Sequence, residues 1–138
     1  MINYLEERAS VILDEADAVT LASISEEGYP RPIAMTKLYA DGIQTIYFET
    51  LERLEGPTKV KQFSENEKAG VEFHKGSDSV TIFGVVGVIT DKELITDIRS
   101  KATKPYLHSA DSDKYRLLKF TAKRALFAID GQFKRQDY

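Results

Sequence analysis

The chain has 138 residues, the length of one ordinary domain, a formal net charge of −3 and no cysteine. These values exclude disulfides, thiolate metal sites and cysteine nucleophiles, and the negative charge argues against nucleic acid as the main partner. Residues 1–8 lack the pattern of a secretory signal, and the longest apolar run, 82–89, is too short to cross a bilayer. We therefore expect one cytoplasmic domain over residues 1–138.

The first part of the chain predicts a helix followed by three strands. Apolar residues recur at spacings of three and four through the first segment, and Asn3 is placed to cap it. Short β-branched runs follow, with Gly28 supplying the positive φ of a hairpin turn. Pro30 and Pro32 each remove a ladder donor, which indicates an edge strand or an irregular start. In chain order we expect the helix at 2–16 and strands at 18–25, 30–39 and 44–50.

The rest of the chain predicts two more helices and four more strands. Thr58 and Asp91 are placed to cap the two helices. Gly84 and Gly87 lie in the longest apolar strand, where glycine permits a bend or a close approach of backbones. In chain order we expect a polar loop at 51–57, a helix at 58–66, strands at 69–74 and 80–90, a helix at 91–101, an irregular segment at 103–114, and strands at 115–121 and 124–130.

Tight turns join most neighbouring strands, so pairing is expected to be mostly antiparallel. No helix separates the first three strands, which argues against a doubly wound parallel sheet. The predicted fold is mainly β: an antiparallel barrel with peripheral helices.

The sequence gives little support for a metal site, a serine nucleophile or a glycine-rich nucleotide loop. The two histidines, His74 and His108, lie in different segments, so a metal site would need them to converge with carboxylates. The alternative interpretation for each histidine is a hydrogen-bonded residue that binds no metal. No Gly-x-Ser-x-Gly elbow, Gly-x-Gly-x-x-Gly fingerprint or Walker A loop is present.

One anion-binding candidate remains, at residues 56–61. This segment opens a short helix, and it offers the Thr58 hydroxyl with the charges of Lys59 and Lys61. Arg31 lies between two prolines that fix its backbone, and a rigid guanidinium suits bidentate phosphate recognition. The alternative is a capped surface helix with solvated lysines. An anion site needs Arg31 and Lys59 to approach each other.

An ordered series of motifs resembles the pyridoxamine 5'-phosphate oxidase-like family, which builds an FMN-binding split barrel, and within it the general stress protein 26-like branch. The resemblance covers about residues 5–89 well and the remainder loosely. It rests on ASISEEGYPRPIAM at 22–35, IYFET at 46–50, TKVKQF at 58–63, NEKAGVEF at 66–73 and VTIFGVVGV at 80–88.

The resemblance implies a homodimer that holds one FMN at each interface site. It implies that Arg31 and Lys59 bind the FMN phosphate with help from Thr58, and that Thr50 reaches the ribityl or phosphate region. The backbone of Ile33, Ala34 and Met35 would run along the isoalloxazine ring, and residues near Phe83 would approach from the partner chain. FMN would then carry the redox chemistry.

Two departures from the family pattern keep alternatives open. Eight residues separate Thr50 from Lys59, a longer loop than the family's, and they include Glu52 and Glu55. The C-terminal tryptophan–arginine segment of genuine pyridoxamine phosphate oxidases is missing, which argues against that reaction. The lead hypothesis is an FMN-dependent oxidoreductase that acts on a small molecule.

The alternatives are a non-catalytic flavin-binding stress protein, and a split barrel that has lost FMN and binds another ligand. Haem held through His74 or His108 is an example of such a ligand. Residues 103–113 either line the site or cover the barrel.

Overall fold

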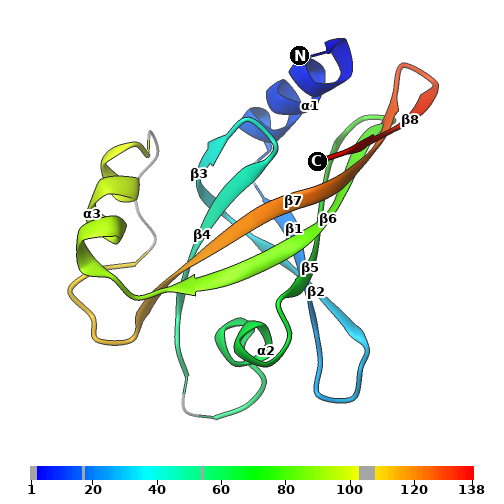
Figure 1. The fold of residues 1–138 in the computed structure, drawn as a ribbon. Helices are drawn as coiled ribbons and strands as arrows, with labels where there is room; N and C mark the ends of the chain where they lie inside the picture. Colours follow the sequence, from blue (N-terminus) through cyan, green and yellow to red (C-terminus); the bar gives the residue numbers. More distant parts are fainter. Residues whose placement is uncertain (1–2, 17, 54, 103–107) are drawn as a thin grey trace.

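The computed structural model describes residues 3–16, 18–53, 55–102 and 108–138. Strands dominate, and three short helices lie around them (Figure 1). The elements in chain order are α1 (Tyr4–Glu15), β1 (Val19–Ile24), β2 (Pro30–Met35), β3 (Lys37–Asp41), β4 (Thr45–Leu51), α2 (Lys59–Glu65), β5 (Lys68–Lys75), β6 (Asp78–Ile89), α3 (Lys92–Ser100), β7 (Tyr115–Ile129) and β8 (Gln132–Asp137).

All strands of the described residues belong to one antiparallel sheet in the order β2-β1-β5-β6-β7-β4-β3, with β8 added on β7. The first and last strands of this path, β2 and β3, are neighbours in the chain and are separated only by Thr36. A single residue cannot bridge a flat sheet of seven strands. The sheet therefore curls until its two edges meet at Thr36, and the predicted antiparallel split barrel is confirmed.

Two apolar clusters lie on the two faces of the curled sheet. Alternate side chains point to opposite faces of a strand, so Phe48 of β4 and Phe120 of β7 join the interior cluster, whereas Tyr47 and Leu117 join the exterior one. The exterior cluster also contains Ile95 and Ile98 of α3 and so fixes this helix against β3, β4 and β7.

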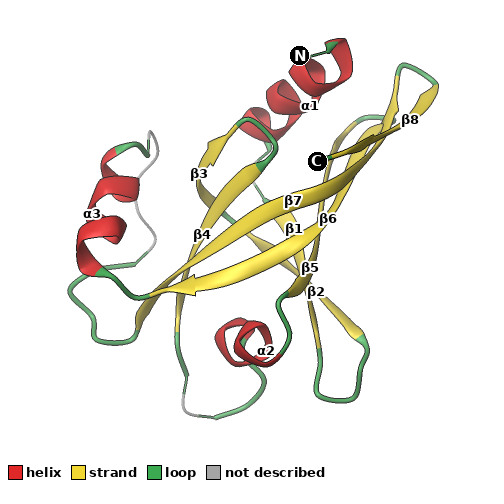
Figure 2. Cartoon of the chain, viewed as in Figure 1, coloured by secondary structure: helices red, strands yellow, loops and turns green. Residues whose placement is uncertain are grey.

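The three helices begin at the predicted caps. The side chains of Asn3, Thr58 and Asp91 accept hydrogen bonds from the backbone N–H of Glu6, Lys61 and Glu93, respectively, at 2.8–3.1 Å. Figure 2 shows the helices at separate places around the sheet, with α2 next to the β1–β2 hairpin. In the described part of the chain, no helix is both long and apolar enough to cross a membrane.

The strand boundaries correct three of the sequence expectations. The strand expected at 30–39 is interrupted at Thr36, because its two halves pair with opposite ends of the sheet. The two strands expected at 115–121 and 124–130 form one continuous β7, in which an irregular register next to Lys123 marks the expected break. Residues 103–107 of the expected irregular segment lie outside the described residues.

The third correction is strand β8, which the sequence reading missed. It pairs with β7 across a turn in which Asp130 and Gly131 have φ values of 53° and 73°. Two successive positive φ values are typical of the two-residue hairpin turn that Asp-Gly favours.

Of the two β6 glycines expected to permit a bend or a close backbone approach, Gly84 makes a close approach. A Cβ atom at this position would lie 2.1 Å from the carbonyl oxygen of Thr121. At Gly87, a Cβ atom would meet no atom within 4 Å. Only Gly84 is therefore required by the packing of β6 on β7.

Candidate functional site

A hollow of about 210 Å³ lies between strand β2 and the end of strand β4. The pairing of Lys37 with Phe48, continued by two residues, would set Met35 opposite Thr50. Both residues instead line the hollow, so it opens at the point where the β3–β4 ladder ends. Its lining comes from β2, the end of β4, the start of α2 and the chain before β7: Arg31, Ile33, Met35, Thr50, Leu51, Arg53, Pro57, Thr58, Lys59 and His108.

The structure brings six of the seven predicted site residues to this hollow: Arg31, Ile33, Met35, Thr50, Thr58 and Lys59. The seventh, Ala34, is exposed and does not line the hollow. Side chains alternate along β2, so Ala34 faces the other side of the strand from Ile33 and Met35. The approach of Arg31 and Lys59 that the anion-site hypothesis requires is thus present.

Lys59 is buried, unlike the solvated lysine of the alternative interpretation. Its side chain turns inward, where Nζ donates to the Ser23 hydroxyl at 2.9 Å and to the Arg31 carbonyl at 2.5 Å. The Ser23 hydroxyl in turn donates to Oε1 of Gln62 at 2.5 Å. Lys61, by contrast, is exposed and pairs with Glu26 at 2.8 Å.

The surroundings of Lys59 disfavour its charge. Burial lowers the pKa of the Lys59 ammonium to about 8, and the nearby Arg31 guanidinium adds to this effect. No described carboxylate lines the hollow, whereas Arg31, Arg53 and Lys59 all do. A cationic hollow without a counter-charge favours an anionic ligand.

The backbone of β2 offers polar groups at the same edge. In an antiparallel strand, both backbone polar groups of a residue lie on the same side. The Ser25 N–H donates to the Tyr29 carbonyl at 2.8 Å, so by alternation along the β1–β2 register the backbone groups of Ile33 and Met35 face β1, and those of Ala34 face away from it. Pro30 and Pro32 also face away from β1, so neither removes a bond from the β1–β2 ladder, which is compatible with the position of β2 at an edge of the sheet.

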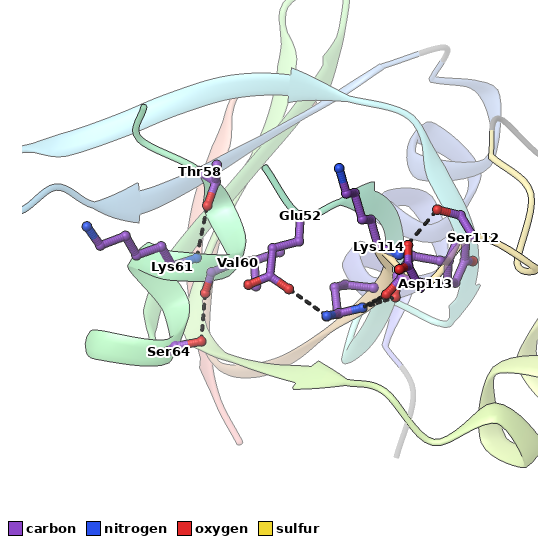
Figure 3. A network of polar contacts seen from close by, with 10 residues as sticks. Glu52, Thr58, Val60, Lys61, Ser64, Ser112, Asp113 and Lys114 are labelled. Carbon is purple, nitrogen blue, oxygen red and sulfur yellow. Dashed lines mark hydrogen bonds and ion pairs between the residues drawn. The ribbon is translucent and has the colours of Figure 1, made fainter. Parts of the chain in front are cut away.

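The acidic loop before α2 is partly neutralised. Glu52 forms an ion pair with Arg116 of β7 at 2.6 Å (Figure 3) and does not line the hollow. The negative charge of Glu52 is therefore directed toward β7. Arg53, which follows, lies in the hollow and adds a cation that sequence reasoning missed.

The two histidines differ in position. His108 lines the hollow, and its backbone carbonyl accepts a 2.9 Å hydrogen bond from Arg99 of α3. His74 is on β5 with its side chain 65% exposed and bonds Glu72 at 2.7 Å. No described set of three histidines or carboxylates is arranged to hold a metal ion.

A second, apolar hollow lies on the outer face of the sheet over β1, β5 and β6. Phe83 lines it and is 48% exposed, although phenylalanine is usually buried. Lys68 and Lys123 are the charged residues in its lining, which also includes Ala22, Ile24, Pro30, Ala69, Gly70, Gly84 and Val85. An exposed apolar surface of this kind is typical of a binding face.

Sequence reasoning also missed Ser23 and Gln62, although both leave a signal. Val19, Leu21 and Ser23 occupy the buried positions of β1, so Ser23 is a polar residue in an inward-facing series. Gln62 follows Lys59 by three residues, which puts the two on one face of α2. A polar side chain at each of these positions predicts a buried hydrogen bond.

Comparisons with solved structures agree on the fold. A protein from Clostridium acetobutylicum related to general stress protein 26 superimposes with a TM-score of 0.82 at 17% identity, covering 99% of this chain and 96% of that one. General stress protein 26 from Bacillus anthracis gives a TM-score of 0.74 at 16% identity, with coverage of 97% and 100%.

A haem-binding protein from Mycobacterium smegmatis is also similar, with a TM-score of 0.78 at 16% identity. It matches 99% of this chain over 59% of its own length. No curated protein matches the chain by sequence. The model of the family "Pyridoxamine 5'-phosphate oxidase" matches residues 5–128, which include every described residue of both hollows. The chain therefore belongs to the pyridoxamine 5'-phosphate oxidase family.

Proposed function

We propose that the chain binds FMN in the cationic hollow and uses it as a flavin-dependent oxidoreductase on a small molecule. The observation that carries this proposal is the convergence of Arg31, Lys59 and Thr58 in one hollow with no described carboxylate. The guanidinium and ammonium would bind the phosphate. Thr58 accepts from the Lys61 N–H through its oxygen, so its own hydroxyl proton can be donated to the phosphate.

The residues next to these cations suit the rest of a flavin. Thr50 offers a hydroxyl for the ribityl chain, and the edge of β2 offers the backbone groups of Ala34 and the apolar side chains of Ile33 and Met35 for the ring. FMN would supply the redox chemistry, and these residues would bind and orient it.

A second copy of the chain would complete the site. A volume of about 210 Å³ is below the range of pockets that enclose a ligand of this size, about 300–1,000 Å³, so one chain leaves part of the flavin uncovered. The apolar outer face around Phe83 is the surface that we propose for the homodimer contact. Sedimentation at micromolar concentration tests it: Phe83→Asp should yield monomers, whereas Leu94→Asp on exposed α3 should not.

A fluorescence titration with FMN tests the cofactor. FMN should bind and lose fluorescence, and Lys59→Met should weaken binding about tenfold or more because it removes a charged hydrogen bond. Lys61→Met is the matched control, since this neighbouring lysine lies outside the hollow. Riboflavin lacks the phosphate and should not respond to either substitution. Absence of FMN binding to the unaltered protein would overturn the proposal.

Turnover separates the oxidoreductase from a flavin-binding stress protein. An oxidoreductase should oxidise a reduced nicotinamide cofactor, or reduce an added acceptor, through its bound flavin. Flavin binding without turnover over a panel of both would favour the non-catalytic alternative.

Haem is a second candidate ligand, because His108 lines the same hollow. A titration with haem would give a Soret band that His108→Ala removes. His74→Ala is the control, because His74 is exposed elsewhere on the sheet. A band that survives His108→Ala, or no band at all, would exclude this site for haem.

A further inference from the structure

Hydrogen bonds connect the side chains of Lys59, Ser23 and Gln62, and of these three residues Lys59 lines the cationic hollow. Lys59 and Gln62 come from α2, and Ser23 comes from β1. Their relative exposures are 6% for Lys59, 3% for Gln62 and 0% for Ser23. Buried polar side chains require hydrogen-bond partners, and each of these three bonds another member of the group.

The direction of these hydrogen bonds is fixed by chemistry. The carboxamide oxygen of Gln62 can only accept a hydrogen bond, so the Ser23 hydroxyl donates its proton to this oxygen. The lone pairs of Ser23 then remain for Lys59, whose ammonium donates to Ser23 and to the Arg31 carbonyl. An ammonium has three protons, so one is left, and Lys59 lines the hollow.

We propose that Ser23 and Gln62 are positioning residues that hold the Lys59 ammonium as a hydrogen-bond donor for an anion in the cationic hollow. Where the anion is a flavin phosphate, this rests on the proposed function. Without the Ser23 acceptor, the buried ammonium keeps only the Arg31 carbonyl among the protein acceptors that the structure shows for it. Its neutral amine form is then favoured, and the donor for the anion is lost.

Among the described residues, the charged and titratable groups around Lys59 are few, so a change in its protonation can be measured. Arg31 from β2, Arg53 after β4 and His108 before β7 share the hollow, and Lys61 and Glu65 lie on α2 itself. Lys61 is paired with Glu26, and no carboxylate of the described residues lines the hollow. A carboxylate introduced at Gln62 would accept from Ser23 as the amide does, and it would add the missing negative charge near the ammonium.

Competitive acetylation of the flavin-free protein across pH 6–10, read out by mass spectrometry, tests the proposal, because only neutral amines react. Relative to the unaltered protein at pH 7.5, Ser23→Ala and Gln62→Leu should raise Lys59 labelling several-fold. Gln62→Glu should lower it several-fold, and Ser23→Thr, which retains the hydroxyl, should leave it close to the original value.

Ser64→Ala is the matched control on α2. The Ser64 hydroxyl donates to the Val60 carbonyl at 2.8 Å, outside this chain of bonds (Figure 3). Opposite shifts for Gln62→Leu and Gln62→Glu support the proposal even if Ser23→Ala fails to fold. Shifts in the same direction, or no shift, overturn it. FMN titration is a separate measurement: if FMN does not bind the unaltered protein, the proposed function fails, and the labelling result still decides the role of Ser23 and Gln62.

Discussion

Arg99 of α3 and Glu49 of β4 form a buried ion pair, with 2.7 Å between Nη1 and Oε2. The same Nη1 donates to the carbonyl of His108, and the guanidinium lies 5.2 Å from the centre of the Tyr115 ring. One side chain therefore connects α3 to the sheet and also bonds the backbone of His108, a residue that lines the cationic hollow.

Removing one member of this pair should be costly. Arg99→Met leaves the Glu49 charge in a buried place, and we expect a loss of about 3 kcal/mol in the free energy of unfolding. The double variant Arg99→Met/Glu49→Leu should recover part of the loss, because it buries no charge. Lys101→Met breaks an exposed pair with Asp97 and should cost below about 0.5 kcal/mol. Urea denaturation measures all three, and equal losses for Arg99→Met and Lys101→Met would contradict the prediction.

Gly84→Ala and Gly87→Ala should differ strongly in stability. At Gly84 the added methyl group would collide with the Thr121 carbonyl and the Phe120 ring, so we expect a loss of about 3 kcal/mol. At Gly87 it meets open space, and the change should stay within about 0.5 kcal/mol. Thermal or urea unfolding of the two variants provides the comparison, and similar midpoints would show that the β6–β7 approach is looser than described.

The contribution of Lys59 to the stability of the flavin-free protein should increase as pH rises from about 8 to 10. The pKa of Lys59 is about 8 in the folded chain, against an ordinary value of 10.5, so within this range the unfolded chain binds more protons. Over this range the protonation equilibrium of Lys59 therefore adds about 1 kcal/mol per pH unit to the free energy of unfolding. Lys59→Met removes the contribution, so the difference between the two proteins should grow with pH. Urea titrations at pH 7.5, 8.5 and 9.5 measure it, and a constant difference would argue against the lowered pKa.

FMN affinity should change in the opposite sense. The second phosphate proton leaves near pH 6, so above pH 7.5 only the ammonium titrates at this contact. As Lys59 loses its proton above pH 8, binding at pH 9 should weaken by up to about tenfold relative to pH 7.5. Lys59→Arg keeps its charge and should show no such decline, and neither should riboflavin. A decline shared by riboflavin would assign the pH dependence to another group.

The features that were predictable from the sequence are those that depend on neighbouring residues. The caps Asn3, Thr58 and Asp91 act within three residues of themselves, and the alternation of apolar side chains gives each strand its buried face. The interruption at Thr36 was not predictable in this way. Nothing local distinguishes residues 30–35 from 37–41; they separate because their partners, β1 and β4, lie at opposite ends of the sheet.

The candidate site shows the same division. Arg31, Thr58 and Lys59 were identified from local chemistry and a family resemblance, and the structure places them together. Ser23 was passed over, because its role depends on a helix 36 residues further along the chain. Polar residues in buried registers are visible in a sequence, but only the fold shows which distant group they bond.

The single residue between β2 and β3 also sets the width of the cationic hollow. Its walls are β2 on one side and the end of β4 on the other, and β4 is held to β3 by its ladder. Thr36 is thus a covalent tether between the two walls, although it is not among the residues that line the hollow. Each residue inserted there would lengthen the tether by up to about 3.5 Å. Relatives of this chain could then accommodate ligands of different thickness by changing the length of one short connection, with every binding side chain retained.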